Sequence, residues 1–121
     1  MTAAHAPKGW LNACDTRALV LGRVLEIPLP SETDRPLTAL LVRDGKGCPR
    51  AYLNLCQHLP IPLDAGGGRF LSADGSHLVC QTHGAAYRLS DGVCERGPCL
   101  GKVLVALLVQ ERAGRLFIKC P

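Results

Sequence analysis

Two short segments of the chain each place one thiol close to one imidazole. The first reads Cys-Gln-His at 56–58, the second reads Cys-Gln-Thr-His at 80–83, and twenty-one residues separate them. A connection of that length allows the second segment to return to the first. Thiolates and imidazoles are the side chains that bind zinc and iron–sulfur centres in proteins. Cys56, His58, Cys80 and His83 are therefore predicted to form one metal site.

The composition of each segment bears on which metal it binds. Structural zinc accepts two cysteines with two histidines, but its usual spacings group the cysteines together and the histidines together. Here each segment contains one of each kind. A binuclear iron cluster with two cysteines on one iron and two histidines on the other needs each segment to reach both irons. The pattern favours such a cluster, and a zinc site is the alternative.

Short apolar runs separated by glycine-containing turns predict the elements that position these ligands. The expected turns are the Asp-Gly pairs at 44–45, 74–75 and 91–92 and the Ala-Gly pair at 113–114. No long helix is evident, so we expect an all-β fold of antiparallel strands. The expected strands are residues 19–27, 38–43, 51–55, 78–80, 86–89, 104–110 and 115–119. Each ligand segment follows an expected strand, so both can lie on adjacent loop tips of one sheet.

The length and composition limit the architecture. With 121 residues, the chain is long enough for one domain and too short for a two-domain enzyme, so we expect a single domain over residues 1–121. Aromatic residues make up only 4% of the sequence, so Leu, Val and Ala must fill the interior. Two segments rich in Pro and Gly, 59–68 and 97–101, predict irregular backbone around something other than a side-chain core.

Charge and apolar patterning exclude several classes of partner. The formal net charge of +4 is spread along the chain without a basic helix or stripe, which argues against nucleic acid. The longest apolar run, 103–109, is far shorter than the roughly 20 residues that cross a bilayer, which argues against a membrane. The first ten residues contain no twin arginine or signal-peptide pattern, so we expect a cytoplasmic protein. In the cytoplasm, seven cysteines are expected to be thiols or metal ligands.

The segments C-x-H and C-x-x-H-G resemble the paired motif of the Rieske iron–sulfur family. The resemblance continues through CQTHGAAYR at 80–88 and DGVCERGP at 91–98, and it covers most of the chain from Leu37 onward. It implies a Rieske-type iron–sulfur fold, with small antiparallel sheets and a cluster-binding subdomain at one end, at approximately residues 54–101. It also implies a Rieske-type [2Fe–2S] cluster as the cofactor.

The resemblance assigns a role to each ligand. Cys56 and Cys80 would bind the iron that stays ferric, whereas His58 and His83 would bind the iron that takes the electron, with the imidazoles at the tip of the molecule. It further implies four supporting residues around the cluster, with Tyr87 as a hydrogen-bond donor and Gly97-Pro98 in the loop that covers the third side. These are Gly84, Tyr87, Gly97 and Pro98.

Three positions depart from the high-potential branch of the family. Its two ligand loops are joined by a disulfide whose cysteines correspond to Ile61 and Thr82 here, and a serine donor corresponds to Ala85. Hydrogen bonds to sulfur raise the reduction potential of such clusters. We therefore expect a potential in the lower part of the Rieske range of about −150 to +300 mV.

The resemblance implies a soluble one-electron carrier that is not an enzyme by itself. A flavin-dependent reductase would be the electron donor, and a terminal oxygenase or a related enzyme would be the acceptor. A second hypothesis is a small accessory subunit of a larger oxidoreductase, such as NADH-dependent nitrite reductase. Many subunits of that kind lack the cluster ligands, which are all present here. A third hypothesis is a zinc-stabilised interaction module.

The remaining cysteines and histidines have simpler interpretations. Cys94 and Cys99 are expected to be buried thiols beside the cluster, with additional ligands or a redox pair as alternatives. His77 is expected at a solvated hairpin position, and the glycines at 66–68 are expected in a flexible loop rather than a phosphate cradle. Protease chemistry is disfavoured because no orienting Asn or Asp is marked. Inert thiols are expected at Cys14, Cys48 and Cys120.

Overall fold

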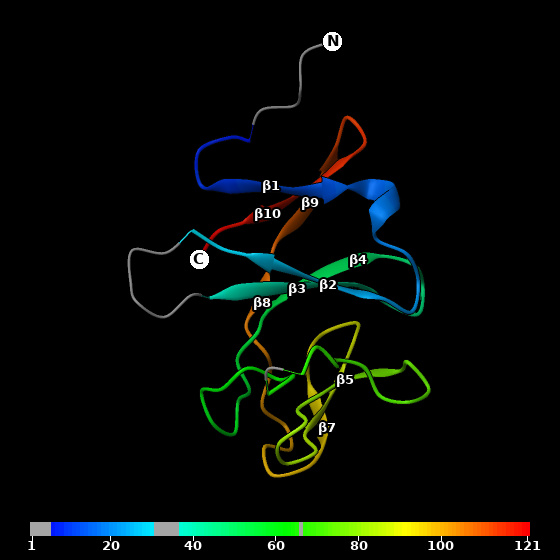
Figure 1. Cartoon of the computed structure of the whole chain (residues 1–121), viewed down its shortest axis with the longest axis vertical. Helices are drawn as coiled ribbons and strands as arrows, with labels where there is room; N and C mark the ends of the chain where they lie inside the picture. The colour runs from blue at the N-terminus through cyan, green and yellow to red at the C-terminus, as the bar shows by residue number, and fades with distance from the viewer. Residues whose placement is uncertain (1–5, 31–36, 66) are drawn as a thin grey trace.

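Ten strands form three antiparallel sheets in the computed structural model, which describes residues 6–30, 37–65 and 67–121. The sheets follow one another along the long axis of the molecule, with β1, β9 and β10 at one end and β5 and β7 at the other (Figure 1). Within the described residues the only helix is η1, a 3-10 turn at Thr16–Ala18. The predicted all-β antiparallel fold is confirmed.

The first sheet has the strand order β1-β10-β9, with β1 at Trp10–Asp15, β9 at Val109–Arg112 and β10 at Arg115–Lys119. Ala113 and Gly114 have positive φ angles of 51° and 76°, so the predicted hairpin turns through these two residues. The prediction missed β1, in which every residue is half-buried and apolar and polar residues do not alternate.

The second sheet has the order β2-β3-β4-β8. Its strands are β2 at Val24–Pro28, β3 at Thr38–Arg43, β4 at Pro49–Leu53 and β8 at Ala106–Leu107. β3 has its predicted bounds, whereas β4 lies two residues earlier than expected. The predicted strand 19–27 begins too early because a turn with Gly22 at φ 84° precedes β2. The predicted strand 104–110 is wrong as one element, since β8 and β9 belong to different sheets.

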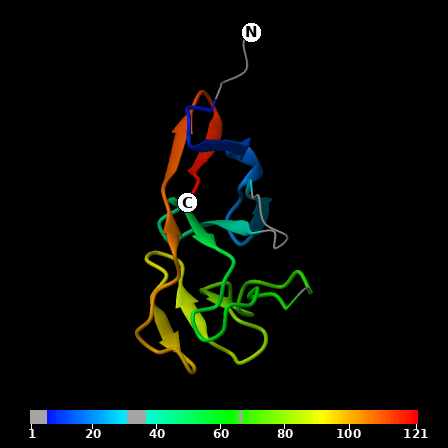
Figure 2. The ribbon, with the colours of Figure 1, turned by 90° about the vertical axis from the view of Figure 1, so that its left-hand side faces the viewer.

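Both faces of β3 are covered by other parts of the molecule. Ala39, Leu40, Leu41 and Val42 are each at most 1% exposed. Successive side chains point to opposite faces of a sheet, so this uninterrupted apolar run contributes to two cores. Ala39 and Leu41 pack toward the first sheet, and Leu40 and Val42 pack toward the third. Figure 2 shows the second sheet between the other two. The second sheet is therefore a middle layer.

We call the two cores the upper and the lower core. The upper core consists of Leu19, Leu29, Ala39, Leu41, Ala51, Leu53, Leu116 and Ile118. The lower core consists of Leu40, Val42, Tyr52, Cys56, Leu63, Phe70, Leu78, Cys80, Ala85, Tyr87, Cys94, Cys99 and Leu104. Four cysteines therefore lie in the lower core, whereas the upper core has only the partly buried Cys14 packed against it among the described residues.

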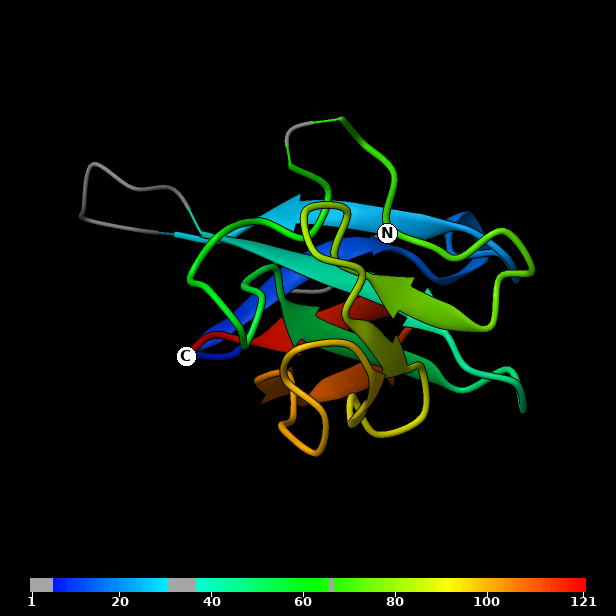
Figure 3. The same cartoon turned by 90° about the horizontal axis from the view of Figure 1, so that it is seen from below.

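The third sheet has the order β5-β6-β7, with β5 at His77–Val79, β6 at Ala86–Arg88 and β7 at Cys94–Arg96. Seen from below, this sheet and its loops are nearest to the viewer (Figure 3). β5 and β6 lie within one residue of their predicted bounds. β7 was not predicted because two of its three residues are exposed and charged, so it has no apolar run, and its register with β6 shifts at a bulge.

Candidate metal centre

The two ligand segments lie on loops that follow β4 and β5, at the end of the molecule formed by the third sheet (Figure 1). In the first loop, the side-chain oxygen of Asn54 accepts a hydrogen bond from the Leu63 amide at 2.8 Å. In the second loop, the Gln81 amide donates to the Leu63 carbonyl at 2.7 Å. Leu63 is fully buried, so it fixes both loops to each other and to the lower core.

The second loop makes a tight turn between β5 and β6. The Cys80 amide donates to the Ala85 carbonyl at 2.8 Å, and the Gly84 amide donates to the Cys80 carbonyl at 2.9 Å. Gly84 has φ +77°, although a Cβ there would meet no atom within 4 Å. The backbone conformation, rather than the available space, therefore favours glycine at this predicted supporting position.

The structure buries the two predicted sulfur ligands and exposes the two predicted nitrogen ligands. Cys56 is 4% exposed and Cys80 is fully buried, whereas His58 and His83 both lie at the surface. The two imidazole rings meet edge to face, with centroids 4.8 Å apart and an interplanar angle of 83°. Side chains from two loops thus lie together in two layers, with imidazoles outside and thiols inside.

The two thiols differ in how readily they ionise. Burial disfavours the charged form of Cys56, but the Tyr87 hydroxyl and the loop amides of His58 and Leu59 outweigh it, so the pKa of Cys56 is lowered. Burial raises the pKa of Cys80, and the amides of its own loop offset this only in part. The charge of an ionised Cys56 also raises the pKa of Cys80, so ionisation of one thiol opposes ionisation of the other.

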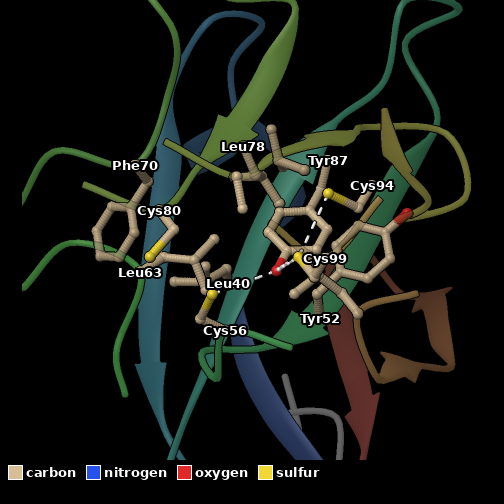
Figure 4. Close-up of a cluster of buried hydrophobic side chains, with 13 residues drawn as sticks. Leu40, Tyr52, Cys56, Leu63, Phe70, Leu78, Cys80, Tyr87, Cys94 and Cys99 are labelled. Atoms are coloured by element: carbon tan, nitrogen blue, oxygen red, sulfur yellow. Dashed lines mark hydrogen bonds between the residues drawn. The ribbon is translucent and has the colours of Figure 1, made fainter. Parts of the chain in front are cut away.

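Tyr87, on β6, lies beside the Cys56 thiol as predicted for a hydrogen-bond donor. Its Oη is 3.3 Å from Cys56 Sγ (Figure 4). The same oxygen accepts a hydrogen bond from the Gln57 amide at 3.0 Å. Burial, together with the hydrogen bonds to Cys56 and Cys99, raises the pKa of Tyr87 far above its ordinary value. The phenol therefore keeps its proton and can donate a hydrogen bond to a sulfur ligand.

Gly97 packs directly against the second ligand loop. A Cβ at Gly97 would lie 2.7 Å from Ala85 Cα and 3.0 Å from the Ala85 amide nitrogen, and its φ is +100°. Both the conformation and the close approach therefore require glycine there. Pro98 is exposed beside it. The two residues occupy a third segment at this end of the molecule, next to the loop of Cys80 and His83.

The cysteines outside the predicted ligand set fall into two groups. Cys94 and Cys99 are 1% and 2% exposed, with their sulfur atoms 3.3 Å apart, so they are buried thiols as expected. Cys48 is exposed, and Cys14 and Cys120 are half-buried.

His77 differs from its prediction. Its ring is 18% exposed rather than freely solvated, and it hydrogen-bonds to Ser76 Oγ and Glu95 Oε2, both at 2.7 Å. It lines a cleft of about 790 Å³ that contains none of the four predicted ligands. Of the glycine triplet, residue 66 lies outside the described residues, and the amide of Gly68 donates to the Asp64 carboxylate at 3.1 Å.

Comparison with known families identifies the class of this centre. The family model of the Rieske [2Fe-2S] domain matches residues 9–111. The chain belongs to this family. Its cofactor is therefore a Rieske-type [2Fe–2S] cluster, and the Rieske domain is an electron-transfer fold that is not catalytic on its own. The predictions of family and cofactor are confirmed.

Solved structures with the same Rieske fold include components of carbazole 1,9a-dioxygenase. The terminal oxygenase from Novosphingobium sp. KA1 has 19% identity and a TM-score of 0.74 over 92% of this chain and 29% of that chain. The terminal oxygenase from Nocardioides aromaticivorans IC177 has 22% identity and a TM-score of 0.72 over 93% of this chain and 30% of that chain. The chain thus spans less than a third of these matched chains.

A further match is to a complex of reduced oxygenase and oxidized ferredoxin in carbazole 1,9a-dioxygenase. It has 21% identity and a TM-score of 0.70, and covers 93% of this chain and 94% of that chain. At these identities the likeness establishes the fold. No curated protein sequence matches the chain.

The side chains present fit a Rieske cluster. Two thiols and two imidazoles are its donor set, and each of its irons takes only two protein ligands. Within 6–30, 37–65 and 67–121, no three His, Cys, Asp or Glu side chains are grouped to hold one metal ion. The match to the Rieske [2Fe-2S] domain distinguishes this cluster from a four-ligand zinc site.

Several residues that shape the Rieske centre were not predicted from the sequence. Asn54, Leu63 and the Gln57 amide act through contacts with residues distant in sequence or through backbone groups, which leave no signal in a motif.

Among the residues that the structure describes, no helix is long and apolar enough to cross a membrane.

Proposed function

We propose that Cys56 and Cys80 bind one iron of the Rieske cluster and that His58 and His83 bind the other. The observation that supports this most strongly is the pair of exposed imidazoles, with ring centroids 4.8 Å apart, beside two buried thiols. Two imidazoles that share one iron must lie this close together. The supporting residues are Gly84, Tyr87, Gly97 and Pro98.

When bound, the cluster supplies a one-electron couple. The rings of His58 and His83 provide the exposed route between that couple and a docked partner, because they are the ligands at the surface. The lower core keeps water away from Cys56 and Cys80. The Tyr87 hydroxyl and the loop amides donate hydrogen bonds to sulfur, and they stabilise the more negative, reduced state.

The protein acts as an electron carrier between a flavin-dependent reductase and a terminal oxygenase. The supporting observation is that the matched structures include complexes of oxygenase with ferredoxin, in one of which the match covers 94% of the matched chain. Ala85 has no hydroxyl, and Ile61 and Thr82 cannot form the disulfide of the high-potential branch, which supports a potential in the lower part of the Rieske range.

Residues 54–101 form the proposed cluster-binding subdomain within a single domain of residues 1–121. The supporting observation is that the third sheet and both ligand loops fall in this range and share the lower core. None of the seven cysteines is paired in a disulfide, which supports the prediction of a reducing compartment such as the cytoplasm.

Removal of one buried thiol tests the ligand assignment. Cys80→Ala should abolish the visible absorption of the purified protein and the EPR signal of its reduced form. The matched control is Cys48→Ala, which removes an exposed thiol and should retain two irons and two sulfides per chain. Zinc without iron or sulfide in the wild-type protein would refute the proposal.

An electron-transfer assay tests the carrier role. Under anaerobic conditions, a flavin-dependent reductase with NADH should reduce the cluster-loaded protein, and an added terminal oxygenase should reoxidise it. Both rates should rise with the concentration of the partner. Purification as a fixed-stoichiometry component of a larger oxidoreductase, without exchange, would contradict the carrier role and identify the accessory subunit.

A further inference from the structure

A series of side chains joined by hydrogen bonds leads from Cys56 into the lower core. Cys56 Sγ is 3.3 Å from Tyr87 Oη, which is 3.0 Å from Cys99 Sγ. Cys99 Sγ in turn donates to Cys94 Sγ at 3.3 Å (Figure 4). The Cys94 thiol donates to the Arg96 carbonyl at 3.0 Å. Cys99 therefore contacts the side chain that contacts the ligand sulfur, and it does not contact that sulfur itself.

When iron is bound, the number of available protons limits the directions of these hydrogen bonds. Each thiol and each phenol has a single proton to donate. A cysteine bound to iron is a thiolate and has none, so the contact between Cys56 and Tyr87 then requires the phenol as the donor. The oxygen of Tyr87 is left with acceptor sites only. One of these accepts the Gln57 amide at 3.0 Å.

The contact between Tyr87 and Cys99 then has one possible direction. Because the phenol proton is used toward Cys56, this contact is a hydrogen bond only with Cys99 as the donor. Cys99 has one proton and two acceptors within reach, Cys94 Sγ at 3.3 Å, to which it donates in the structure, and Tyr87 Oη at 3.0 Å. The phenol oxygen is closer and is a stronger acceptor than a thiol sulfur, so with iron bound the Cys99 thiol turns its proton to the Tyr87 oxygen. The thiol of Cys94 keeps its own acceptor, the Arg96 carbonyl, in this orientation. The two buried thiols thus have different hydrogen-bond acceptors, although they are adjacent and equally shielded from water.

We infer that Cys99 is a positioning residue that tunes the Rieske cluster through Tyr87. A hydrogen bond accepted by the phenol oxygen polarises its O–H group and strengthens the bond that it donates, since hydrogen bonds in a series are cooperative. The stronger bond to Cys56 stabilises the extra negative charge of the reduced state and raises the reduction potential. This inference rests on the proposed assignment of Cys56 as a ligand.

The test compares variants of the two neighbouring thiols in the cluster-loaded protein. Cys99→Ala removes the donor to Tyr87 and should lower the equilibrium constant for reduction by about threefold, which is a fall of about 28 mV because tenfold is 59 mV. Cys94→Ala removes an equally buried thiol and should leave the potential unchanged. Cys99→Ser keeps a donor and should restore the potential toward the wild-type value. Spectroelectrochemical titration measures all three.

Equal shifts in Cys99→Ala and Cys94→Ala would show a packing effect and overturn the inference, and so would no shift in either. Should Cys99→Ala fail to fold, Cys99→Val fills the space without a donor, and its comparison with Cys99→Ser decides in the same way. A wild-type protein without a [2Fe–2S] spectrum would refute the proposed function. An intact spectrum with an unchanged potential in Cys99→Ala would refute only this inference.

Discussion

At the residue scale, the hydroxyl groups of the two buried tyrosines in the lower core contact different kinds of acceptor. Both are at most 1% exposed. The hydroxyl of Tyr52 donates to the Leu89 carbonyl at 2.7 Å, whereas that of Tyr87 lies 3.3 Å from Cys56 Sγ. Burial raises the pKa of Tyr52 to about 12, so this phenol also stays protonated. The difference between them is therefore the acceptor, and that makes Tyr52 a natural control for Tyr87.

Tyr87→Phe should lower the reduction potential of the loaded protein. The substitution removes the side-chain hydroxyl that contacts Cys56. The expected loss is about three- to tenfold in the equilibrium constant for reduction, or about 28–59 mV. Tyr52→Phe removes an equally buried hydroxyl and should leave the potential unchanged. Potentiometric titration of both variants measures the difference. An equal shift in both would contradict the role of Tyr87.

At this scale the proposed ligands can be read from the sequence, whereas the residues that contact them cannot. Each thiol–imidazole pair lies within four consecutive residues, so its spacing can be read directly. The contact between Tyr87 and Cys99 depends instead on the pairing of β6 with β7 and on the turn that follows β7. No local pattern encodes it, because it arises only when three segments pack together.

At the element scale, a buried carboxylate organises the turn between β3 and β4. Asp44 is 2% exposed, and its oxygens accept hydrogen bonds from the amides of Lys46 and Cys48 at 2.9 and 3.0 Å and from the Arg50 side chain at 3.0 Å. Burial opposes ionisation of Asp44, but these donors outweigh it, and the pKa of the carboxyl is lowered. The Asp-Gly turn signal thus has a specific structural basis.

Asp44→Ala should lower the free energy of unfolding by about 2–3 kcal/mol, because two amides and a guanidinium lose a charged acceptor. The lowered pKa means that the ionised carboxylate contributes stability above about pH 4, and that this contribution disappears as the pH falls through the folded-state pKa. The difference between wild type and variant in urea denaturation should therefore shrink in acid. A difference that grows in acid would contradict this account.

Gly97→Ala should loosen the second ligand loop, because the new Cβ would lie 2.7 Å from Ala85 Cα. We expect loss of visible absorbance in an iron chelator to be about 10- to 100-fold faster than in wild type. Gly101→Ala is the matched control, since Gly101 has a similar φ of +87° but open space around it. Both variants have backbone strain of about 1–3 kcal/mol, and only Gly97→Ala has the clash. Equal rates would show that strain alone matters.

The elements themselves were predictable where one pattern dominated. β3 was placed correctly because its continuous apolar run is bounded by Thr38 and Arg43, and the β9–β10 hairpin because of its Ala-Gly turn. β1 was missed because its half-buried residues show no alternation, and β7 was missed because two of its three residues are exposed and charged. The pairing of β1 with β10 joins the two ends of the sequence, which no local signal reveals.

At the scale of the whole molecule, the two cores depend on the cofactor to different degrees. The lower core contains Cys56 and Cys80, whereas the upper core contains none of the proposed ligands. Loss of the cluster would leave two thiols without the metal that joins their loops. The middle sheet separates the two cores, so we expect this loss to be felt mainly in the third sheet.

Removal of the cluster should therefore destabilise one end of the molecule. In hydrogen exchange, amides of β5 and β6 should exchange at least about tenfold faster in the apoprotein, because their opening free energy falls. Amides of β1 and β10 should keep their wild-type protection. Comparison of loaded and chelator-treated protein by mass spectrometry measures both sets. Uniform loss of protection would contradict the independence of the two cores.

The burial of the thiols and the exposure of the imidazoles also limit how partners can use this protein. Because His58 and His83 are the only surface members of the proposed ligand set, an electron donor and an electron acceptor must occupy the same small area in turn. Each then competes with the other for access. Steady-state turnover should consequently rise and then decline as either partner is added in excess, and a crosslinked complex with one partner should be inactive toward the second.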